Sequence, residues 1–332
     1  MIDIVILWVD QNDQKWGEQY ALYRKDEKNV YSTSSSRYRD WDLLKYWFRS
    51  IEQNANWINK IHFVTYGHLP HWLNINNKKL NIVLHSEIID FEFLPTFNSH
   101  TIELNIHRIE GLAEKFIYFN DDFFLNQEIK PEFFFRKDLP VDFLVMDSLR
   151  QTGVDSFFGC IKHRSIAVCN SYFKKYDVLS NHFFKVFNFK YGIGLLLNIL
   201  NLPMSNFSYL STPHLPQAYL KKVFSDVWKN EEQFLNEVCR NKFRQATDVN
   251  QYIFRNWQLL SGLFNPVYPY NRGNFYNINS SNIDSIVADI VECRAKTLCI
   301  NDSDLVDNFD ELKEKLTAAF NLRYPNKSSF EL

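Results

Sequence analysis

The chain has few cysteines and no disulfide pattern. Its 332 residues include five cysteines, and no two of them form a Cys-x-x-Cys pair. An odd count without such pairs suits reduced thiols better than a disulfide framework. We therefore expect free thiols and a reducing cytoplasm. The five positions are Cys160, Cys169, Cys239, Cys293 and Cys299.

The chain also lacks a strong charge of either sign. Its formal net charge is −2, with 37 basic and 39 acidic residues. A nucleic-acid-binding domain usually shows a strongly basic balance. We therefore expect no nucleic acid among its partners. The sequence contains no internal repeat and no low-complexity tract, which excludes repeat architectures.

Long hydrophobic runs are missing as well. At the N-terminus Asp3 interrupts the apolar run and Asp10 ends it, so we expect no signal peptide. The most apolar stretch, residues 183–202, is broken by lysines, asparagines and glycines short of about 18 clean apolar residues. Two interpretations stay open: a segment packed on the domain, or a membrane-surface patch around residues 192–197. We expect a cytoplasmic protein with at most peripheral contact with the inner face of the membrane.

Hydrophobic residues are nonetheless plentiful, at 45% of the chain. This suffices for one large domain. Buried strands are predicted at residues 2–9, 61–66, 82–85, 116–119 and 141–146, with helices at 43–51 and 98–109 between them. Asp40 or Asp42 could cap the first of these helices. Alternating strands and helices predict an α/β fold with a mostly parallel central sheet and flanking helices. Helical patterns at residues 226–239, 249–263 and 308–321 predict a more helical C-terminal part.

The stretch from Phe116 to Phe124 reads Phe-Ile-Tyr-Phe-Asn-Asp-Asp-Phe-Phe. It has the form of a buried strand that ends on two adjacent carboxylates, Asp121 and Asp122, at a ligand crevice. Hard oxygen ligands suit Mg²⁺ or Mn²⁺ bound to a diphosphate, and Asn120 could orient them. Alternatively, the pair caps a following helix.

The stretch before it can form a helix capped by Asn98 or Ser99. His100, Glu103 and His107 lie three and four residues apart, so their side chains would share one face. Two histidines are unusual on a solvated amphipathic face, although such a face remains the alternative.

Further candidates follow the first strand. Asp10 and Asp13 could accept hydrogen bonds from a base or ribose, and Arg37 and Arg39 could bind phosphate through two donors each. The alternative for the two arginines is surface ion pairing with Asp40 or Asp42.

Several of these motifs together resemble the Stealth family of polysaccharide phosphotransferases. The resemblance spans nearly the whole chain and rests on blocks such as Arg37-Tyr-Arg-Asp-Trp, Leu94-Pro-Thr-Phe-Asn-Ser-His, Phe116-Ile-Tyr-Phe-Asn-Asp-Asp, Thr212-Pro-His-Leu-Pro, Phe243-Arg-Gln-Ala-Thr-Asp and Cys299-Ile-Asn-Asp. It implies one catalytic domain over residues 1–332, with a sheet similar to a glycosyltransferase A-type nucleotide-sugar domain. Residues 127–205 match no family block, so we expect a variable insertion there.

The resemblance also implies roles for residues. His214, in a loop stiffened by prolines, is the first choice of general base, with Glu103 and His100 as alternatives. Arg244 would stabilise charge on the transferring phosphoryl group and Asp248 would hold it, although the two could instead form an intrahelical salt bridge. The residues assigned to substrate binding are Asp10, Asp13, Arg37, Arg39, Asn98, Ser99, Arg108 and Asn120, and Asp121 and Asp122 are assigned to the metal.

The implied activity is transfer of a hexose 1-phosphate, for example N-acetylglucosamine 1-phosphate, from a UDP-sugar to a hydroxyl of a glycan or lipid-linked oligosaccharide. The reaction would release UMP and leave a phosphodiester link in a capsular or surface polysaccharide. A metal-dependent glycosyltransferase that releases UDP is the alternative, because an acidic pair after a buried strand serves both reactions. A third hypothesis is a non-enzymatic polysaccharide-binding module, since aromatic residues make up 17% of the chain.

Overall fold

A five-stranded sheet forms the centre of the molecule. The computed structural model describes residues 1–25, 39–148, 157–302 and 306–332. The strand order is β10-β4-β1-β2-β3. The first four strands of the chain are parallel, and β10 is antiparallel to β4. These strands are β1 (Ile2–Leu7), β2 (Ile61–Thr65), β3 (Leu80–Leu84), β4 (Lys115–Phe119) and β10 (Gln217–Leu220).

Apolar side chains cover this sheet on both faces. Phe116 and Phe119 are three residues apart on β4, so their rings point to opposite faces. The Phe119 ring packs edge to face against Trp47 of α2 (Leu44–Asn54), and Phe116 packs against Phe224 of α9 (Lys221–Cys239). Two buried faces explain why β4 is apolar throughout rather than alternating.

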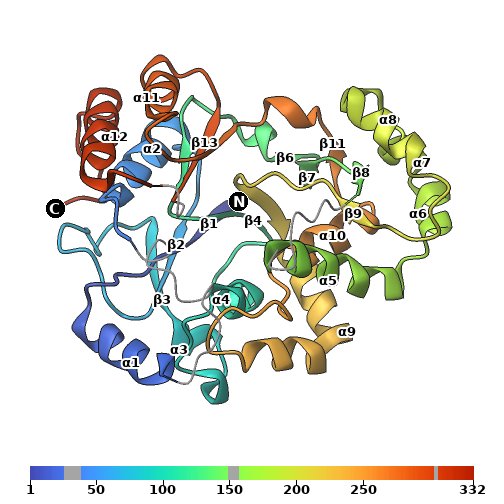
Figure 1. The fold of residues 1–332 in the computed structure, drawn as a ribbon, viewed down its shortest axis with the longest axis horizontal. Helices are drawn as coiled ribbons and strands as arrows, with labels where there is room; N and C mark the ends of the chain where they lie inside the picture. The colour runs from blue at the N-terminus through green and yellow to red at the C-terminus, as the bar shows by residue number, and fades with distance from the viewer. Residues whose placement is uncertain (26–38, 149–156, 303–305) are drawn as a thin grey trace.

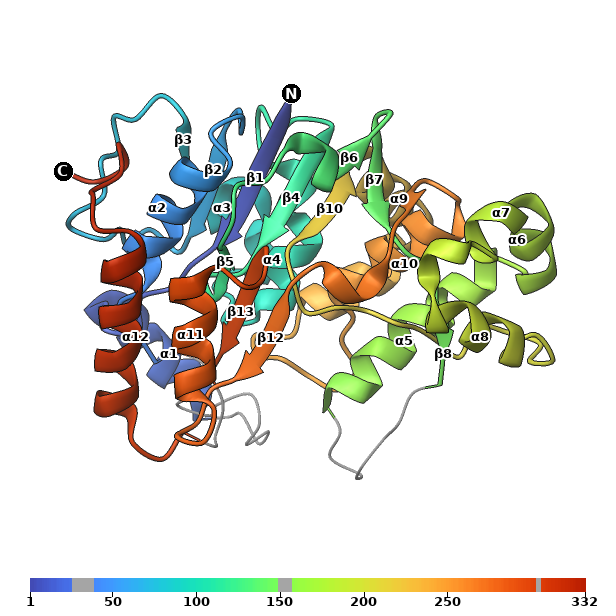
Figure 2. The ribbon, with the colours of Figure 1, turned by 90° about the horizontal axis from the view of Figure 1, so that it is seen from above.

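The helices form two layers around the sheet. In Figures 1 and 2, α2, α11 and α12 lie on one face, and α3, α4 and α9 lie on the other. Here α3 is His85–Ile88, α4 is Ser99–Asn105, α11 is Ile283–Glu292 and α12 is Phe309–Arg323. Helix α1 (Gln14–Arg24) follows β1. Single 3₁₀ turns occupy η3 (Phe91–Phe93), η4 (Ile106–Arg108), η5 (Pro131–Phe133) and η7 (Pro269–Asn271).

Smaller sheets extend the central one. β5 (Phe123–Leu125) pairs with β13 (Thr297–Asn301), which pairs with β12 (Asn274–Asn277). β7 (Leu139–Asp142) lies between β6 (Phe135–Arg136) and β11 (Asn265–Pro266), and β8 (Met146–Asp147) pairs with β9 (Tyr209–Leu210). The other helical elements are α5 (Phe157–Tyr172), α6 (Lys175–Asn181), α7 (Phe183–Val186), η6 (Phe189–Tyr191), α8 (Ile193–Leu200) and α10 (Tyr252–Leu260).

The predicted α/β class with a mostly parallel central sheet is confirmed. The assignment of residues 127–205 as a variable insertion stays a prediction. Two described parts of that segment pack on the rest of the protein, because α5 lies against α10 and β7 pairs with β11.

Three local expectations differ from the structure. Neither Asp40 nor Asp42 caps α2; its N-cap is Leu43, with no side-chain hydrogen bond. The predicted helix over residues 98–109 ends at Asn105, and residues 106–108 form a 3₁₀ turn. Residues 241–250 form turns and loop rather than helix, because Asp248 accepts bonds from the surrounding loop and α4, so an intrahelical pair between Arg244 and Asp248 is wrong.

Candidate active site

The acidic pair lies in the turn between β4 and β5. The next element is a strand, so the interpretation of the pair as a cap of the following helix is wrong. Because β5 pairs antiparallel with β13, Cys299 lies beside this turn. Its thiol donates to Oδ2 of Asp122 at 3.3 Å, and the nearby side-chain amide of Asn120 acts to lower the pKa of Asp122. Oδ1 of Asp122 is buried and has no hydrogen-bond partner among the described residues.

The surroundings of this turn disfavour negative charge. Desolvation raises the pKa of Asp122 to about 7, and the charge of Asp121 adds to the shift. Desolvation also raises the pKa of Asp121 to about 6, with a further contribution from Asp40 and an opposing one from Arg244. Asp121 keeps an exposed surface, so bulk water moderates its shift. Two adjacent carboxylates with raised pKa values would be stabilised in their ionised form by a bound cation.

His214 stands next to this turn. Ligand atoms of Asp122, His214 and Cys299 all lie within 4.8 Å of one another. The imidazole packs edge to face between Phe123 and Phe275, and its Nδ1 lies 3.2 Å from the hydroxyl of Tyr252. Burial lowers its pKa to about 4, helped by the positive charges of Lys162 and Arg244. The imidazole is therefore neutral at pH 7 and able to accept a proton.

A buried arginine holds the loop that carries His214. Arg255 of α10 forms two hydrogen bonds with the carboxylate of Asp142, at 2.9 and 2.8 Å. Its remaining nitrogen donates to the Ser211 carbonyl and the Thr212 hydroxyl, which lie three and two residues before His214. This pair is buried, so its bidentate geometry fixes the loop to the core.

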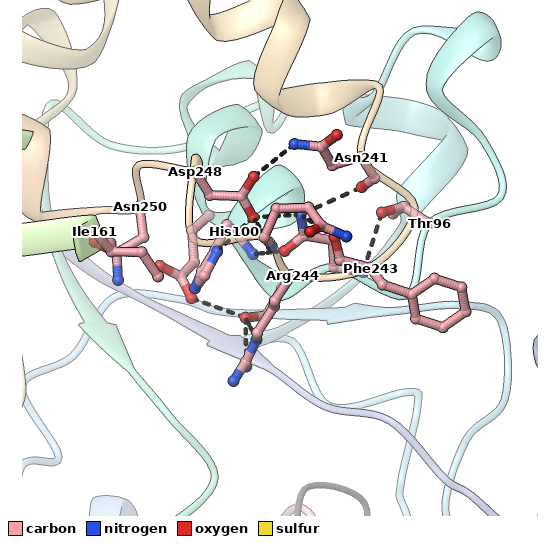
Figure 3. A network of polar contacts seen from close by, with 12 residues as sticks. Thr96, His100, Ile161, Asn241, Phe243, Arg244, Asp248 and Asn250 are labelled. Carbon is pink, nitrogen blue, oxygen red and sulfur yellow. Dashed lines mark hydrogen bonds and ion pairs between the residues drawn. The ribbon is translucent and has the colours of Figure 1, made fainter. Parts of the chain in front are cut away.

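A second aspartate and histidine pair links α4 to the loop after α9. The buried carboxylate of Asp248 accepts from Asn98 Nδ2 at 2.9 Å, from Asn241 Nδ2 at 2.7 Å and from the Gln245 amide at 2.9 Å. Nδ1 of His100 lies 3.0 Å from the same carboxylate (Figure 3). Asn98 also caps α4 by accepting from the His100 amide. We call these residues the Asp248 network.

The Asp248 network positions Arg244. Figure 3 shows the guanidinium of Arg244 extending away from Asp248, toward the opposite side of the network. It donates to the hydroxyl of Ser99 at 2.6 and 3.1 Å, and Ser99 in turn bonds to Glu103. The charge of Arg244 acts on the pKa values of both Asp121 and His214, so all three share one electrostatic environment.

The described residues that the sequence assigns to nucleotide binding have contacts of their own within the protein. Asp10 lies in the loop after β1, where its carboxylate accepts from the Asn12 amide. Asp13 uses one oxygen to cap α1. Arg39 forms a bidentate pair with Asp302 rather than with Asp40 or Asp42, and Arg37 lies outside the described residues.

The end of the predicted polar helix also has another environment. Because α4 ends at Asn105, the side chains of His107 and Arg108 leave the face that carries His100 and Glu103. His107 packs on Phe224 and Trp228, and Arg108 pairs with Asp90 at 2.8 Å and stacks on Trp228.

Sequence reasoning missed four residues around His214. Cys299, Tyr252 and Lys162 lie near His214 or Asp122, and Arg255 fixes the His214 loop. A cysteine count assigns no role to Cys299, although this residue begins the family block Cys299-Ile-Asn-Asp. Tyr252 and Arg255 lie on an apolar helix whose pattern predicts packing alone.

The unpartnered oxygen of Asp122 and the raised pKa values of the acidic pair fit a divalent cation. Oxygen ligands suit Mg²⁺ or Mn²⁺, whereas the nearby thiol and imidazole are softer donors. The acidic pair is therefore the part of this site that fits a hard cation.

The fold and site together define an α/β enzyme whose carboxylates, neutral imidazole and arginine meet where a parallel sheet strand ends. Comparisons with known proteins identify the family of this enzyme. The family model described as Stealth protein CR2, conserved region 2, matches residues 37–142. The chain belongs to the Stealth family, which confirms the resemblance seen in its motifs and identifies an enzyme of the phosphotransferase class rather than a binding module.

Three named relatives align with this chain over nearly their full lengths. The chain is 40% identical to capsular polysaccharide phosphotransferase WcwK of Streptococcus pneumoniae, covering 99% of this chain and 98% of the relative. It is 38% identical to exopolysaccharide phosphotransferase cps2G of Lactiplantibacillus plantarum, covering 99% and 96%. It is 35% identical to receptor polysaccharide phosphotransferase WefC of Streptococcus gordonii, covering 100% and 99%.

Among solved structures, an active-site mutant of LgtC matches with a TM-score of 0.43 at 12% identity, covering 95% of each chain. The galactosyltransferase LgtC with donor and acceptor sugar analogues matches with a TM-score of 0.39. This overlap is too loose to support a functional argument. Among the described residues, no helix is long and apolar enough to cross a membrane.

Proposed function

We propose that this protein transfers a sugar 1-phosphate from a UDP-sugar to a glycan hydroxyl during synthesis of a capsular or related surface polysaccharide, releasing UMP. The observation that carries the proposal is the closeness of Asp122 and His214, in a site on which the charge of Arg244 also acts. Ligand atoms of Asp122 and His214 lie within 4.8 Å, and Arg244 influences the charge state of the imidazole. Attack of an alcohol on phosphorus needs these three functions: a cation site, a base and a positive charge.

Asp121 and Asp122 would hold Mg²⁺ or Mn²⁺, with Asn120 orienting Asp122. The cation would supply positive charge to the diphosphate of the donor. Arg244 would stabilise charge on the phosphoryl group in flight. Its hydrogen bonds to the hydroxyl of Ser99, which itself bonds to Glu103, hold the guanidinium in a fixed place.

His214 would take the proton of the attacking hydroxyl. Burial keeps its imidazole neutral, and Nε2 can act as base if Nδ1 carries the ring proton and donates to the Tyr252 oxygen. The two alternative bases are already engaged. His100 is 1% exposed and contacts Asp248, and Glu103 accepts from Ser99 and from the Gln251 amide. The structure therefore favours His214 over both.

The experiment is incubation with a panel of UDP-sugars and a glycan acceptor, with Mg²⁺ or with EDTA. The panel contains UDP-N-acetylglucosamine, UDP-N-acetylgalactosamine and UDP-galactose. We expect UMP and a phosphodiester signal in the phosphorus NMR spectrum of the product, and no turnover with EDTA. Release of UDP with a glycosidic product would instead establish the competing glycosyltransferase activity.

A further inference from the structure

One segment of the chain exposes many large apolar side chains. It comprises α6, α7, η6 and α8, which lie together at one end of the molecule, opposite α12 (Figures 1 and 2). Phe184, Phe189 and Leu200 are 82%, 92% and 69% exposed. We call the exposed set the α6–α8 surface; its other members are Tyr176, Phe183, Ile193, Leu196, Ile199, Leu202 and Met204.

Helix α8 has its polarity reversed relative to an ordinary surface helix. Its inward face carries Gly194 and the fully buried Asn198, whose side chain bonds to the Leu144 and Val186 carbonyls. A Cβ on Gly194 would lie 2.8 Å from a methyl of Val145, so the helix cannot rotate to bury another face. Ile193, Leu196 and Leu200, spaced three and four apart, are therefore held outward.

The charge of this segment indicates what covers it. From Val178 to Ser225 the chain contains no aspartate or glutamate, although the whole protein has a net charge of −2. Lys185 and Lys190 lie within the segment. A second copy docked face to face would bring these lysines together with Asp177 of α6 as the one carboxylate of the segment to pair with them. An anionic lipid surface complements both the apolar side chains and the lysines.

The position of the surface also suits delivery of an acceptor. Helix α8 packs against β8, and β8 pairs with β9. The chain runs from β9 directly into the loop that holds His214. The α6–α8 surface is thus one strand pair away from the proposed general base.

We infer that the α6–α8 surface is a peripheral docking site for a bilayer containing anionic phospholipid, with the aromatic and aliphatic side chains entering the interface. The contact itself does not depend on the proposed reaction. Its use in bringing a lipid-linked glycan hydroxyl toward His214 rests on the proposed function.

The test is flotation of the full chain with vesicles of phosphatidylcholine and phosphatidylglycerol in a 3:1 ratio, and with vesicles of phosphatidylcholine alone. We expect binding to the mixed vesicles, weaker binding to the neutral ones, and loss of about tenfold or more in the triple variant Phe184→Ser, Phe189→Ser, Leu200→Ser. Lys190→Glu should weaken binding to the mixed vesicles only.

A matched control carries Ile75→Ser, Phe91→Ser and Leu322→Ser, three residues that are 58%, 90% and 69% exposed elsewhere on the molecule. It should bind the vesicles like the parent chain. Equal loss in both triple variants, or no flotation of the parent chain, would overturn the inference. So would a parent dimer that the α6–α8 variant converts to a monomer without any change in vesicle binding.

Nucleotide release with a water-soluble acceptor separates this inference from the proposed reaction. The α6–α8 variant should keep that activity, because its substitutions are on exposed side chains away from the acidic pair. An inactive parent chain that still binds vesicles would remove the proposed function and leave the docking site standing.

Discussion

The molecule contains two aspartate and histidine pairs with opposite environments. Asp248 is fully buried, contacts His100 and receives hydrogen bonds from three further groups. Asp122 lies beside His214 with one buried oxygen unpartnered among the described residues and a pKa raised to about 7. A fully hydrogen-bonded buried carboxylate stabilises the fold, whereas one with an unpartnered buried oxygen costs stability, and we propose that a bound cation offsets this cost at Asp122.

The sharpest test of this contrast is Asp122→Asn. Loss of the cation ligand should lower turnover about 10⁴-fold, measured as nucleotide release. Because the folded pKa of Asp122 is raised, its ionised form destabilises the protein as pH rises from about 4 through 7. The variant should therefore melt higher than the parent at pH 8, by on the order of 2 °C, and at the same temperature near pH 3.5.

The exposed Asp138, which pairs with Lys115 at the surface, provides the control. Asp138→Asn should change neither turnover nor the melting temperature by more than the error. Full activity in Asp122→Asn would contradict the assignment of the metal site.

His214→Gln should lower turnover about 10³-fold and leave the free energy of unfolding nearly unchanged, because general-base catalysis contributes about 10²–10⁴-fold. The measurements are steady-state kinetics and urea unfolding. The exposed His71 gives the control variant His71→Gln, which should behave like the parent. A surviving pH-dependent rate in His214→Gln would move the base to Glu103 or His100.

On the other side of the contrast, Asp248→Ala should destabilise the fold by about 3 kcal/mol, because it leaves buried donors without an acceptor. Urea unfolding measures this. Asp90→Ala, which removes a half-exposed partner of Arg108, should cost less than about 1 kcal/mol. Full stability of Asp248→Ala would show that the Asp248 network does not stabilise the fold.

Cation affinity should depend on pH in the direction set by the acidic pair. Raised pKa values of about 6 and 7 mean that protons compete with the metal below pH 7. If both carboxylates bind the cation, the Mg²⁺ concentration for half-maximal activity should rise about tenfold per pH unit between pH 7 and 6 and about a hundredfold per unit below pH 6, and stay constant above pH 8. Titrations of activity with Mg²⁺ at pH 5.5, 6.5 and 8.5 decide this; an affinity that does not change over that range would exclude the pair as ligands.

The smallest expected effect concerns the orientation of His214. Tyr252→Phe removes the hydroxyl 3.2 Å from Nδ1 and should lower turnover about fivefold, in line with a hydrogen bond of about 1 kcal/mol. The Michaelis constant should not change. A loss confined to substrate binding would instead place Tyr252 against the acceptor.

Local patterns allowed part of this site to be predicted. Asp121 and Asp122 could be recognised because a buried strand and a following polar turn are both local features. Asn98 could be recognised as a cap for the same reason. The end of α4 at Asn105 could not be predicted, because residues 106–108 turn to pack on α9, which is more than a hundred residues away in the chain.

Long-range pairs were not predictable from spacing. For Arg39 the alternative to phosphate binding was an ion pair with the neighbouring Asp40 or Asp42, yet its guanidinium pairs with Asp302. Cys299 meets Asp122 across 177 positions because β13 and β5 pair antiparallel. Such contacts depend on strand register, which the sequence of either strand alone does not specify.

By itself, the sequence determined the α/β class, the placement of the acidic pair after a buried strand and, through its motifs, the family, because hydrophobic periodicity and short polar blocks are encoded locally. The tertiary structure decided which carboxylate is fully hydrogen-bonded and which keeps a buried oxygen without a partner among the described residues. It also decided which histidine contacts Asp248, and that α8 holds Leu196 and Leu200 outward. Those outcomes depend on neighbours brought together by folding, and burial and hydrogen bonding are properties of that assembled environment.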